Sequence, residues 1–502
     1  MNRNILLLPI LFFIVSGFYS CDREDDLITE SSAQLEFSLD TLTFDTVFTT
    51  IGSATRIIKA YNPHNKSINI SRVFLAKGSS SRFRVNIDGI AANESTDIVV
   101  APKDSMYVFA EVTVNPDADI SISPFVIFED LIFETNGNTQ TIVLEAWGQN
   151  ANYIPNEFNV GGAALLSCNL GIETWDDPKP YVIRGILLID SCSLVIPAGT
   201  QIFVHGGLVR QFVEPDSMLN FYNDGIIFVL SEGKIIANGT LEEPVVFQGD
   251  RLEESFQERS GQWAGIRFGA GSTGNEFNFT TIKNSIIGAR VDSAGVLTLN
   301  NSKIYNTAGS GIIGIHSTID ANNTLVYNNG GNCMQVVYGG NYNFNYCTLA
   351  SYGVESSALF LSNALCLDLL CQEFRFNRLR ANFKNSIVFG SRDDEISLFD
   401  RQGNGTDPFV FDYSFENCIV RVEELLDEEL GYPTFFNYCD PCQNGDGSDA
   451  LFFDTGEDDY HLDTLSIAEG RAVPLTGLSL DLDGEMRDGG MPDVGCYEYV
   501  AE

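Results

Sequence analysis

The sequence predicts an all-β protein in which a β-sandwich is followed by a parallel β-helix. Three observations support this fold class. A six-residue pattern recurs over residues 277–420, and its first three intervals are 22, 22 and 23 residues, a fixed period that indicates stacked repeats. Longer strands with alternating apolar and polar residues occupy positions 34–150, which is typical of a sandwich. Asn and Gly flank the short apolar segments throughout, which favours turns over helices.

The first 20 residues have the features of a secretion signal. Arg3 precedes an apolar run over residues 5–15, which is too short to cross a membrane as a helix, and Cys21 follows Gly-Phe-Tyr-Ser. This region resembles the signal peptide of bacterial lipoproteins, and the resemblance implies cleavage before Cys21 and acylation of that residue. Several acyl chains hold a protein stably in a membrane, because each buried methylene contributes about 0.8 kcal/mol.

Residues 21–33 are expected to form an acidic tether. The run Asp-Arg-Glu-Asp-Asp directly follows Cys21, and such charge runs are usually solvated spacers. The run also resembles the export signal of surface lipoproteins of the Bacteroidota, which implies display on the outer face of the outer membrane. The partners that this implies are the outer membrane itself, through the lipid anchor, and an outer-membrane barrel protein or other surface lipoproteins.

Residues 34–150 are predicted to form the sandwich, with Asn-Pro, Asn-Gly and Pro-Lys-Asp turns between the strands. Ala-Tyr-Asn-Pro at Ala60, Pro-Lys-Asp-Ser at Pro102 and Leu-Glu-Ala-Trp-Gly at Leu144 resemble the abnormal-spindle/hydin type of immunoglobulin-like domain. Such domains bind other proteins or act as spacers. Residues 151–162 are expected to link this domain to the next.

The β-helix is expected over residues 163–502. Segments that begin at Gly185, Gly225 and Gly265 are offset by 40 residues each, which predicts early coils that carry inserted loops. Together with Glu-Glu-Pro-Val-Val-Phe at Glu242, they resemble the opening of right-handed β-helix proteins of the pectate-lyase-like superfamily. The resemblance covers about residues 160–500, roughly two thirds of the chain.

The recurring six-residue pattern predicts how the later coils stack. Its first position is apolar, its fourth is small, its sixth is aliphatic, and its third is Asn in four of six copies. One unit cannot bury its apolar side chains alone, so units stack with equivalent residues about 4.8 Å apart. Asn in the third column suits the left-handed backbone of a tight corner, and its amides can bond along the stack. The copies are FNFTTI from Phe277, LNNSKI from Leu299, ANNTLV from Ala321, FNYCTL from Phe344, FKNSIV from Phe383 and FENCIV from Phe415.

The end of the chain is predicted to cap the stack. Asp-Leu-Asp-Gly-Glu-Met-Arg-Asp from Asp481 and Asp-Val-Gly-Cys-Tyr-Glu-Tyr from Asp493 resemble the closing segment of the same superfamily. A cap is needed because an open coil exposes unpaired strand edges. Asp481, Asp483 and Glu485 also have the alternate spacing and the Gly turn that a Ca²⁺ site favours, although a polar turn without an ion explains them as well. No other cofactor is expected.

Charge and cysteine content narrow the function further. The net charge of −39 excludes a general nucleic-acid binder, because phosphate neutralisation requires Lys and Arg. The chain has eleven cysteines, and export permits disulfides. The candidate pairs are Cys168 with Cys192, about one coil apart, and the local pairs Cys366 with Cys371 and Cys439 with Cys442.

Catalytic motifs of the superfamily are not matched. Hydrolases of the polygalacturonase type carry Asn-Thr-Asp, Asp-Asp, Gly-His-Gly and Arg-Ile-Lys in successive coils, and only Asp393-Asp394 corresponds here. Lyases of the pectate type need Ca²⁺-binding carboxylates and an Arg or Lys base on the strand face, where the repeats offer Ser, Thr, Asn and aliphatic residues. No catalytic residue is therefore expected.

The leading hypothesis is a non-catalytic extracellular scaffold, an accessory subunit of an outer-membrane complex for barrel assembly, export or nutrient uptake. The alternatives are a surface glycan-binding protein and a polysaccharide lyase or hydrolase. An exposed strip of aromatic residues favours glycan, whereas an apolar patch with a polar rim favours a protein partner. The aromatic residues to inspect are Trp263, Tyr338, Tyr342 and Tyr346.

Overall fold

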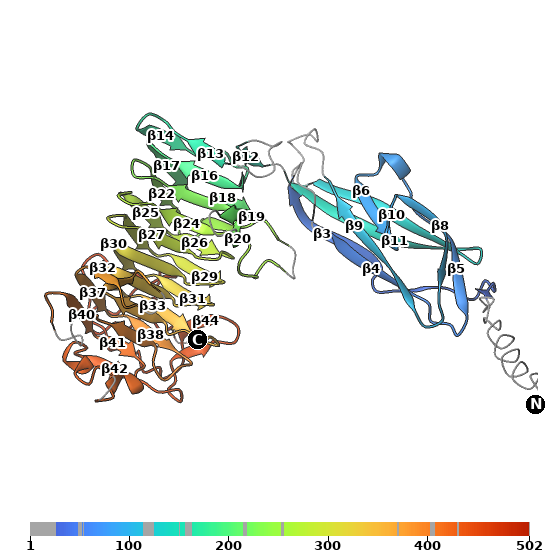
Figure 1. Cartoon of the computed structure of the whole chain (residues 1–502). Coiled ribbons are helices and arrows are strands. Elements are labelled where there is room, and N and C mark those ends of the chain that lie inside the picture. Colours follow the sequence, from blue (N-terminus) through green and yellow to red (C-terminus); the bar gives the residue numbers. More distant parts are fainter. Residues whose placement is uncertain are drawn as a thin grey trace, which may run out of the picture. The chain divides into compact units, whose positions relative to one another are not determined.

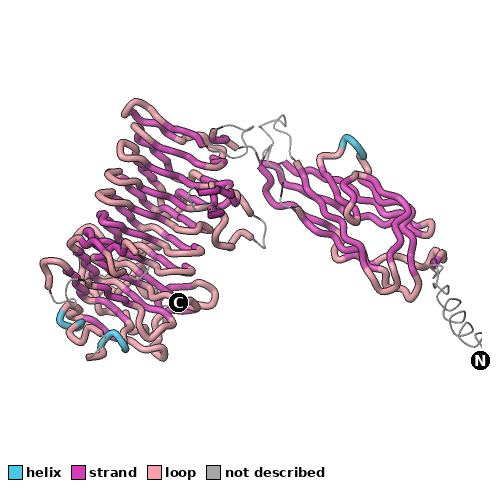
Figure 2. The backbone as a smooth tube through the Cα atoms, in the orientation of Figure 1, coloured by secondary structure: helices cyan, strands magenta, loops and turns pink. Residues whose placement is uncertain are grey.

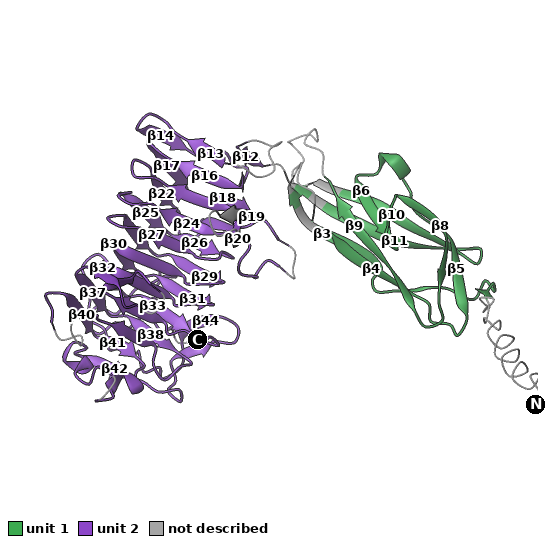
Figure 3. Cartoon of the chain, viewed as in Figure 1, with its two compact units in different colours: residues 1–150 green, residues 151–502 purple. Residues whose placement is uncertain are grey.

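The chain folds into two compact units, Met1–Asn150 and Ala151–Glu502 (Figure 3). The computed structural model describes residues 27–500 apart from 49–52, 54, 114–124, 150, 156–162, 214–217, 253–255, 369–370, 402–406 and 429–430. The described residues form strands joined by loops and short 3-10 turns (Figure 2). The predicted fold class is confirmed, because a β-sandwich precedes a right-handed parallel β-helix (Figure 1). The predicted signal peptide and Cys21 lie outside the described residues.

Two sheets form the first unit, and alternate side chains of each sheet fill the space between them. Phe44 of one sheet and Phe83 of the other are both buried, with ring centroids 5.7 Å apart. Asn62, from the Ala-Tyr-Asn-Pro phrase, is buried and donates to the carbonyls of Lys66, Val100 and Ala101 at 2.9–3.0 Å. The first sheet contains β1 (Leu27–Ile28), β5 (Ser67–Leu75), β10 (Phe125–Thr135), β11 (Asn138–Gln149), β3 (Thr41–Phe48) and β8 (Glu94–Val100); the second contains β2 (Glu36–Phe37), β4 (Arg56–Tyr61), β9 (Ser105–Val112), β6 (Phe83–Ile87) and β7 (Ile90–Ala91).

The second unit is a stack of coils whose parallel strands form three faces. Face 1 contains β13 (Ala163–Leu166), β16 (Ile186–Ile189), β21 (Ile226–Val229), β24 (Gly265–Phe268), β27 (Ala289–Val291), the first halves of β30 (Ile312–Asn322) and β32 (Met334–Asn345), β34 (Leu359–Ser362) and β39 (Ile396–Phe399). Face 2 contains β14 (Gly171–Thr174), β17 (Cys192–Pro197), β22 (Lys234–Asn238), β25 (Asn275–Asn278), β28 (Val296–Asn300), the second halves of β30 and β32, β37 (Leu379–Lys384) and β40 (Phe411–Glu416). Face 3 contains β12 (Asn152–Ile154), β15 (Tyr181–Arg184), β18 (Gln201–His205), β23 (Val245–Gly249), β26 (Thr280–Lys283), β29 (Lys303–Thr307), β31 (Leu325–Asn329), β33 (Thr348–Ser351), β38 (Ile387–Gly390), β41 (Cys418–Val420) and β42 (Cys442–Asn444).

Hairpins and short turns complete the unit. The hairpins are β19 (Leu208–Val213) with β20 (Met218–Asn223), β35 (Ala364–Cys366) with β36 (Phe374–Phe376) and β43 (Phe452–Asp454) with β44 (Asp459–Leu462), and the 3-10 turns are η3 (Glu424–Leu426) and η4 (Phe435–Asn437). The first unit contains one further 3-10 turn among its described residues, η1 (Gly78–Ser80).

The predicted columns of the repeat superpose along the stack. The first-position residues are register partners from Phe277 on β25 to Phe415 on β40, and all six side chains are buried. The sixth-position residues pair in the same way from Ile282 to Val420 on face 3. The rings of Phe344, Phe383 and Phe415 stack with centroid separations of 5.1 and 4.8 Å. The core is therefore a set of continuous side-chain rows.

The third column forms the corner between faces 2 and 3. All six of its residues have positive φ, between 44° and 52°, in the left-handed region that Asn adopts more readily than most residues. The predicted amide ladder, however, runs mainly through the second column. Its links join Asn278, Asn300, Asn322 and Asn345 at 2.9 Å each.

The closing segment is not the cap that the sequence suggested. A strap, defined as residues 450–499, packs along the outside of face 3, with Leu482, Val494 and Cys496 in one buried cluster with Leu325 and Ile387. The end of the stack is closed instead by residues 423–442, where Phe435 and Cys439 join the main core. The prediction is wrong because β31, β33 and β38 present apolar side chains on the outside of face 3, and the closing segment buries these side chains instead of the end of the stack.

Replacing Phe383 with Ala should lower the free energy of unfolding by about 3–5 kcal/mol, because a cavity opens between two stacked rings. Urea unfolding measures the effect. Phe409→Ala is the matched control, since that side chain is 79% exposed and its loss should change stability by less than about 0.5 kcal/mol. Equal effects of the two substitutions would contradict the aromatic row.

Candidate functional site

An apolar surface covers the first three coils of face 1. We define this apolar patch by six outward-facing residues of β13, β16 and β21: Ala163, Leu165, Ile186, Leu188, Ile226 and Phe228. The residues that alternate with them point inward, and Leu187 and Ile227 are buried. Leu165 is 64% exposed, although it belongs to a regular strand, and Ala163 beside it is also exposed, whereas Ile186, Leu188, Ile226 and Phe228 are half-buried. Exposed apolar residues that are contiguous, rather than single, mark interaction sites.

The border of the apolar patch is polar and charged. Phe228 pairs with Arg267 on the next strand, whose guanidinium carbon lies 4.8 Å from the ring centroid. Arg267 Nε and Arg290 Nε both bond to the carboxylate of Asp292, at 2.7 and 2.9 Å. The apolar patch therefore has charged residues along its β24 side, and polar residues beside an apolar centre are usual in protein-protein interfaces.

Face 2 carries a polar surface on its later coils, from β25 to β40. A second row of polar side chains runs beside the Asn ladder: Asn343 donates to Asp320 at 2.6 Å, Asn382 donates to Asn343 at 2.9 Å, and Ser414 donates to Asn382 at 3.0 Å. Each amide satisfies the next, so the row holds its side chains in fixed positions. Such a surface presents hydrogen-bonding groups with a regular spacing.

The aromatic residues singled out from the sequence do not form an exposed strip. Trp263, Tyr342 and Tyr346 are fully buried, and the Trp263 indole donates to the carbonyl of Lys283 at 2.9 Å. Tyr338 is half-buried, and its ring lies 5.5 Å from that of His316. The first three of these residues therefore serve packing.

The Asp393-Asp394 pair is occupied by structural contacts. Asp393 bonds to Arg421 at 2.9 Å. The carboxylate of Asp394 accepts the backbone N–H groups of Glu423, Glu424 and Leu425 at 2.9–3.1 Å. It thereby caps η3, whose first N–H groups have no partner within the turn.

The predicted Ca²⁺ ligands do not converge on a common point. Asp481 is buried, and it accepts the N–H groups of Asp483 and Glu485 through Oδ1 and that of Glu498 through Oδ2. Asp483 instead bonds to His461 Nε2 at 2.7 Å. Over the described part of the chain, no group of three or more Asp, Glu, His or Cys side chains could hold a metal ion. The turn is thus held by backbone donors.

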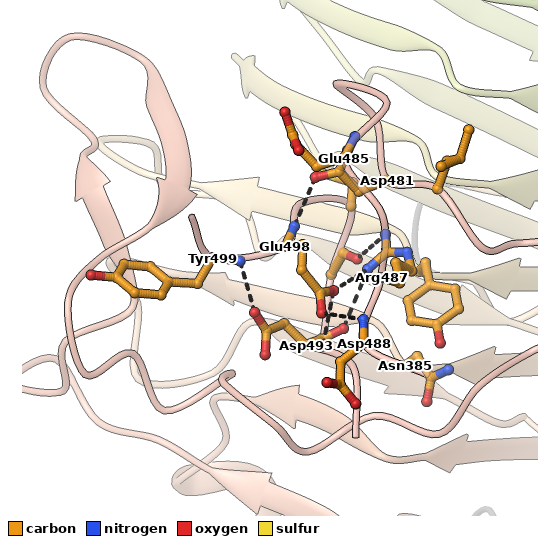
Figure 4. A network of polar contacts seen from close by, with 12 residues as sticks. Asn385, Asp481, Glu485, Arg487, Asp488, Asp493, Glu498 and Tyr499 are labelled. Carbon is orange, nitrogen blue, oxygen red and sulfur yellow. Dashed lines mark hydrogen bonds and ion pairs between the residues drawn. The ribbon is translucent and has the colours of Figure 1, made fainter. Parts of the chain in front are cut away.

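A buried Arg fastens the strap to the coils (Figure 4). The Arg487 side chain is 2% exposed; Nη1 lies 3.3 Å from Glu498 Oε2, and Nη2 donates to Asn323 Oδ1 at 3.1 Å. Its guanidinium carbon lies 3.9 Å from the ring centroid of Tyr346. Asn385 exchanges two hydrogen bonds with the backbone of Val473. Third-column residues therefore hold the strap.

One carboxyl group in the coils is buried without a cation bonded to it. Glu395 is 0% exposed and accepts the N–H groups of Ala358 and Arg392 at 2.8 Å each. Burial raises the pKa of Glu395 to about 7. A Cβ atom at Gly390 would lie 2.3 Å from Oε1 of Glu395, so the carboxyl group fills the space that this Gly leaves.

The three cysteine pairs named from the sequence are joined by disulfides: Cys168–Cys192, Cys366–Cys371 and Cys439–Cys442. Cys333, Cys347, Cys418 and Cys496 are free and buried. Burial raises the pKa of Cys333, Cys418 and Cys496 to about 12. Their thiols therefore carry almost no thiolate at neutral pH, and they act as small core residues.

None of the described helical turns has the length and apolar content needed to cross a membrane.

No family model and no curated protein matches the chain. A protein of unknown function from Porphyromonas gingivalis W83 is 14% identical over 23% of this chain and 46% of its own, with a TM-score of 0.18. The ASH / PapD-like domain of human CEP192 is 11% identical over 24% of this chain and 85% of its own, with a TM-score of 0.16. The catalytic unit of a GH87 alpha-1,3-glucanase from Streptomyces thermodiastaticus strain HF3-3 is 10% identical over 72% and 77%, with a TM-score of 0.22. Likenesses this weak carry no argument about function.

Arg487→Met should lower the free energy of unfolding by about 1–3 kcal/mol, because it leaves the half-buried Glu498 carboxylate without its cation and the buried Asn323 oxygen without its donor. The strap should then be cleaved faster in limited proteolysis. Arg375→Met removes a charge from an exposed side chain and is the control. Unchanged cleavage of the strap in the Arg487 variant would show that the apolar contacts suffice.

Glu395 should make stability depend on pH. Its pKa is about 7 in the folded chain against 4.5 ordinarily, so the folded chain holds this proton more tightly than the unfolded chain. The stabilisation that this provides is fully present below pH 4.5 and is lost as the pH rises through about 7. In the Glu395→Gln variant, the change in the free energy of unfolding over this pH range should be smaller by about 3 kcal/mol, at 1.36 kcal/mol per pKa unit. Urea midpoints of both proteins across this range test it; parallel curves would show that the carboxyl group does not titrate there.

Proposed function

We propose that the protein is a non-catalytic scaffold that is anchored to the outer membrane through acylated Cys21 and displayed on the cell surface. In this function the β-helix docks a protein partner, an outer-membrane barrel or another surface lipoprotein, as an accessory subunit for barrel assembly, export or nutrient uptake. The secretion signal and the acidic tether in the sequence support the location. The apolar patch supports the docking role.

The apolar patch carries the proposal because its side chains are aliphatic and lie on a regular sheet. Three neighbouring strands present apolar residues at six outward positions, two on each strand, whereas the later coils of face 2 present Asn, Asp and Ser. A sheet surface in water gains nothing from such residues unless another molecule covers them. The charged rim at Arg267 and Arg290 suits a protein partner, since interface cores are apolar and their rims are polar.

Glycan binding is the second candidate, and face 2 is the observation that favours it. The fixed amides of Asn300, Asn322 and Asn345 could bond to sugar hydroxyl groups. Sugar sites usually add an exposed ring, and among the four aromatic residues considered only Tyr338 is accessible. Cleavage of polysaccharide is the third candidate; it draws no support from Asp393 and Asp394, which are bonded to Arg421 and to η3.

Leu165→Asp should abolish co-purification of a barrel protein from intact outer membranes, because it replaces the most exposed large side chain of the apolar patch with a charge. The tagged wild type should recover that barrel protein in fixed proportion. Leu465→Asp is the matched control: it makes the same change at a strap residue that is 81% exposed and lies outside the apolar patch.

Two outcomes would contradict the proposal. Recovery of the barrel protein with Leu165→Asp at the wild-type level would remove the apolar patch from the interface. Recovery of the chain alone, together with retardation on polysaccharide gels, would favour the glycan-binding function; loss of that retardation on Asn322→Ala would place the sugar on face 2.

A further inference from the structure

Face 1 ends in a strand whose outer edge has no strand partner. Among the described strands of face 1, β39 pairs only with β34, while every strand of that face from β16 to β34 has a neighbour on both sides. Backbone N–H and C=O groups at such an edge are ready to pair with an added strand. The edge lies at the opposite end of face 1 from the apolar patch.

The register identifies which groups are available. Leu359 is the partner of Ile396, and its N–H donates to the carbonyl of Glu395 at 2.9 Å. In a parallel pair of this register, Ser397 and Phe399 point their backbone groups toward β34, so Ile396 and Leu398 point theirs away from it. Asp400, next in the same series, donates its N–H to the Tyr432 hydroxyl at 3.1 Å, on the outer side.

A cavity of about 540 Å³ lies along this edge, between β39 and the segment that includes η3. The position of this segment is fixed by three hydrogen bonds to Asp394, from the N–H groups of Glu423, before η3, and of Glu424 and Leu425, within it. The apolar side chains of Ile396 and Leu398 point into the core, where they are 1% and 9% exposed. An added strand would therefore meet backbone on one side and the η3 segment on the other.

The charge of this cavity is negative. Asp394, Glu424 and Asp427 are among the described residues that line it, and no Lys or Arg is among those described residues. Arg421, which precedes the η3 segment in the chain, is bonded to Asp393 and to the carbonyl of Gly390. An occupant with positive side chains is favoured here, and an acidic one is repelled.

We propose that the edge of β39 is a second docking site, which accepts an extended, positively charged segment of a partner protein as an added parallel or antiparallel strand. Backbone pairing to Ile396 and Leu398 provides the affinity, and Glu424 and Asp427 select basic side chains. β39 has four residues, so the paired stretch is short, about 13 Å at 3.3 Å per residue. Charged residues beside a free strand edge can also serve only to prevent aggregation, and Glu424 and Asp427 would then bind no partner. The test distinguishes binding from this protective role.

The test uses two labelled peptides and fluorescence anisotropy with the whole protein. One peptide alternates Lys and Thr; the other alternates Lys and Pro, which has the same charge but lacks half of the N–H donors. The Lys-Thr peptide should bind and protect the Ile396 and Leu398 amides from hydrogen exchange. The Lys-Pro peptide should bind at least about tenfold more weakly.

Two exposed residues of one segment provide the matched variants. Glu424→Lys, at the cavity, should weaken binding of the Lys-Thr peptide by about tenfold or more, whereas Glu428→Lys, outside the lining, should change it by less than about twofold. Leu165→Asp should leave it unchanged, so failure of this site and failure of the apolar patch are distinguishable. Equal binding of the two peptides, equal effects of the two charge reversals, or no saturable binding would each overturn the proposal.

Discussion

The structure of the second unit depends on parallel strands that pair in one register from coil to coil. The side-chain period of a strand is two, so a slip of one residue would turn every core column outward. The left-handed corner in the third column prevents this slip, because it returns each coil to the same starting point; its φ values span only 44° to 52° over six coils. The register therefore determines which side chains of each strand point into the core and which point outward, and the outward side chains form the apolar patch, the Asn ladder and the surface beneath the strap.

The core was predictable because its columns are both periodic and apolar. The first and sixth positions could be read directly from Phe277 to Val420, and the corner followed from Asn in the third position. The sequence predicts the ladder in that third column, but amides at the corner turn toward the strap, and Asn385 bonds to Val473. The ladder falls in the second column, where Asn278 and Asn300 face outward on a flat strand.

The outer contacts were harder to predict, because the repeat does not determine what lies over it. One signal was present: the fifth position changes from Thr281 and Lys303 to Leu325 and Ile387, which marks a surface that requires a cover. The apolar patch is not evident from the sequence for a related reason. Ile-Leu-Leu-Ile on β16 reads as a buried run until the register shows that Ile186 and Leu188 point outward.

The strap joins positions that are far apart in the chain, and this has a consequence for the order of folding. Neighbouring coils close over about 22 residues, whereas the bond between Arg487 and Asn323 spans 164. Contacts of long sequence separation form late, because loop closure must precede them. The coils can therefore form one after another during synthesis, and the outer side of face 3 stays exposed to solvent until the last residues of the chain have been made. In the folded protein the strap covers these coils, so it must detach before the coils beneath it can separate.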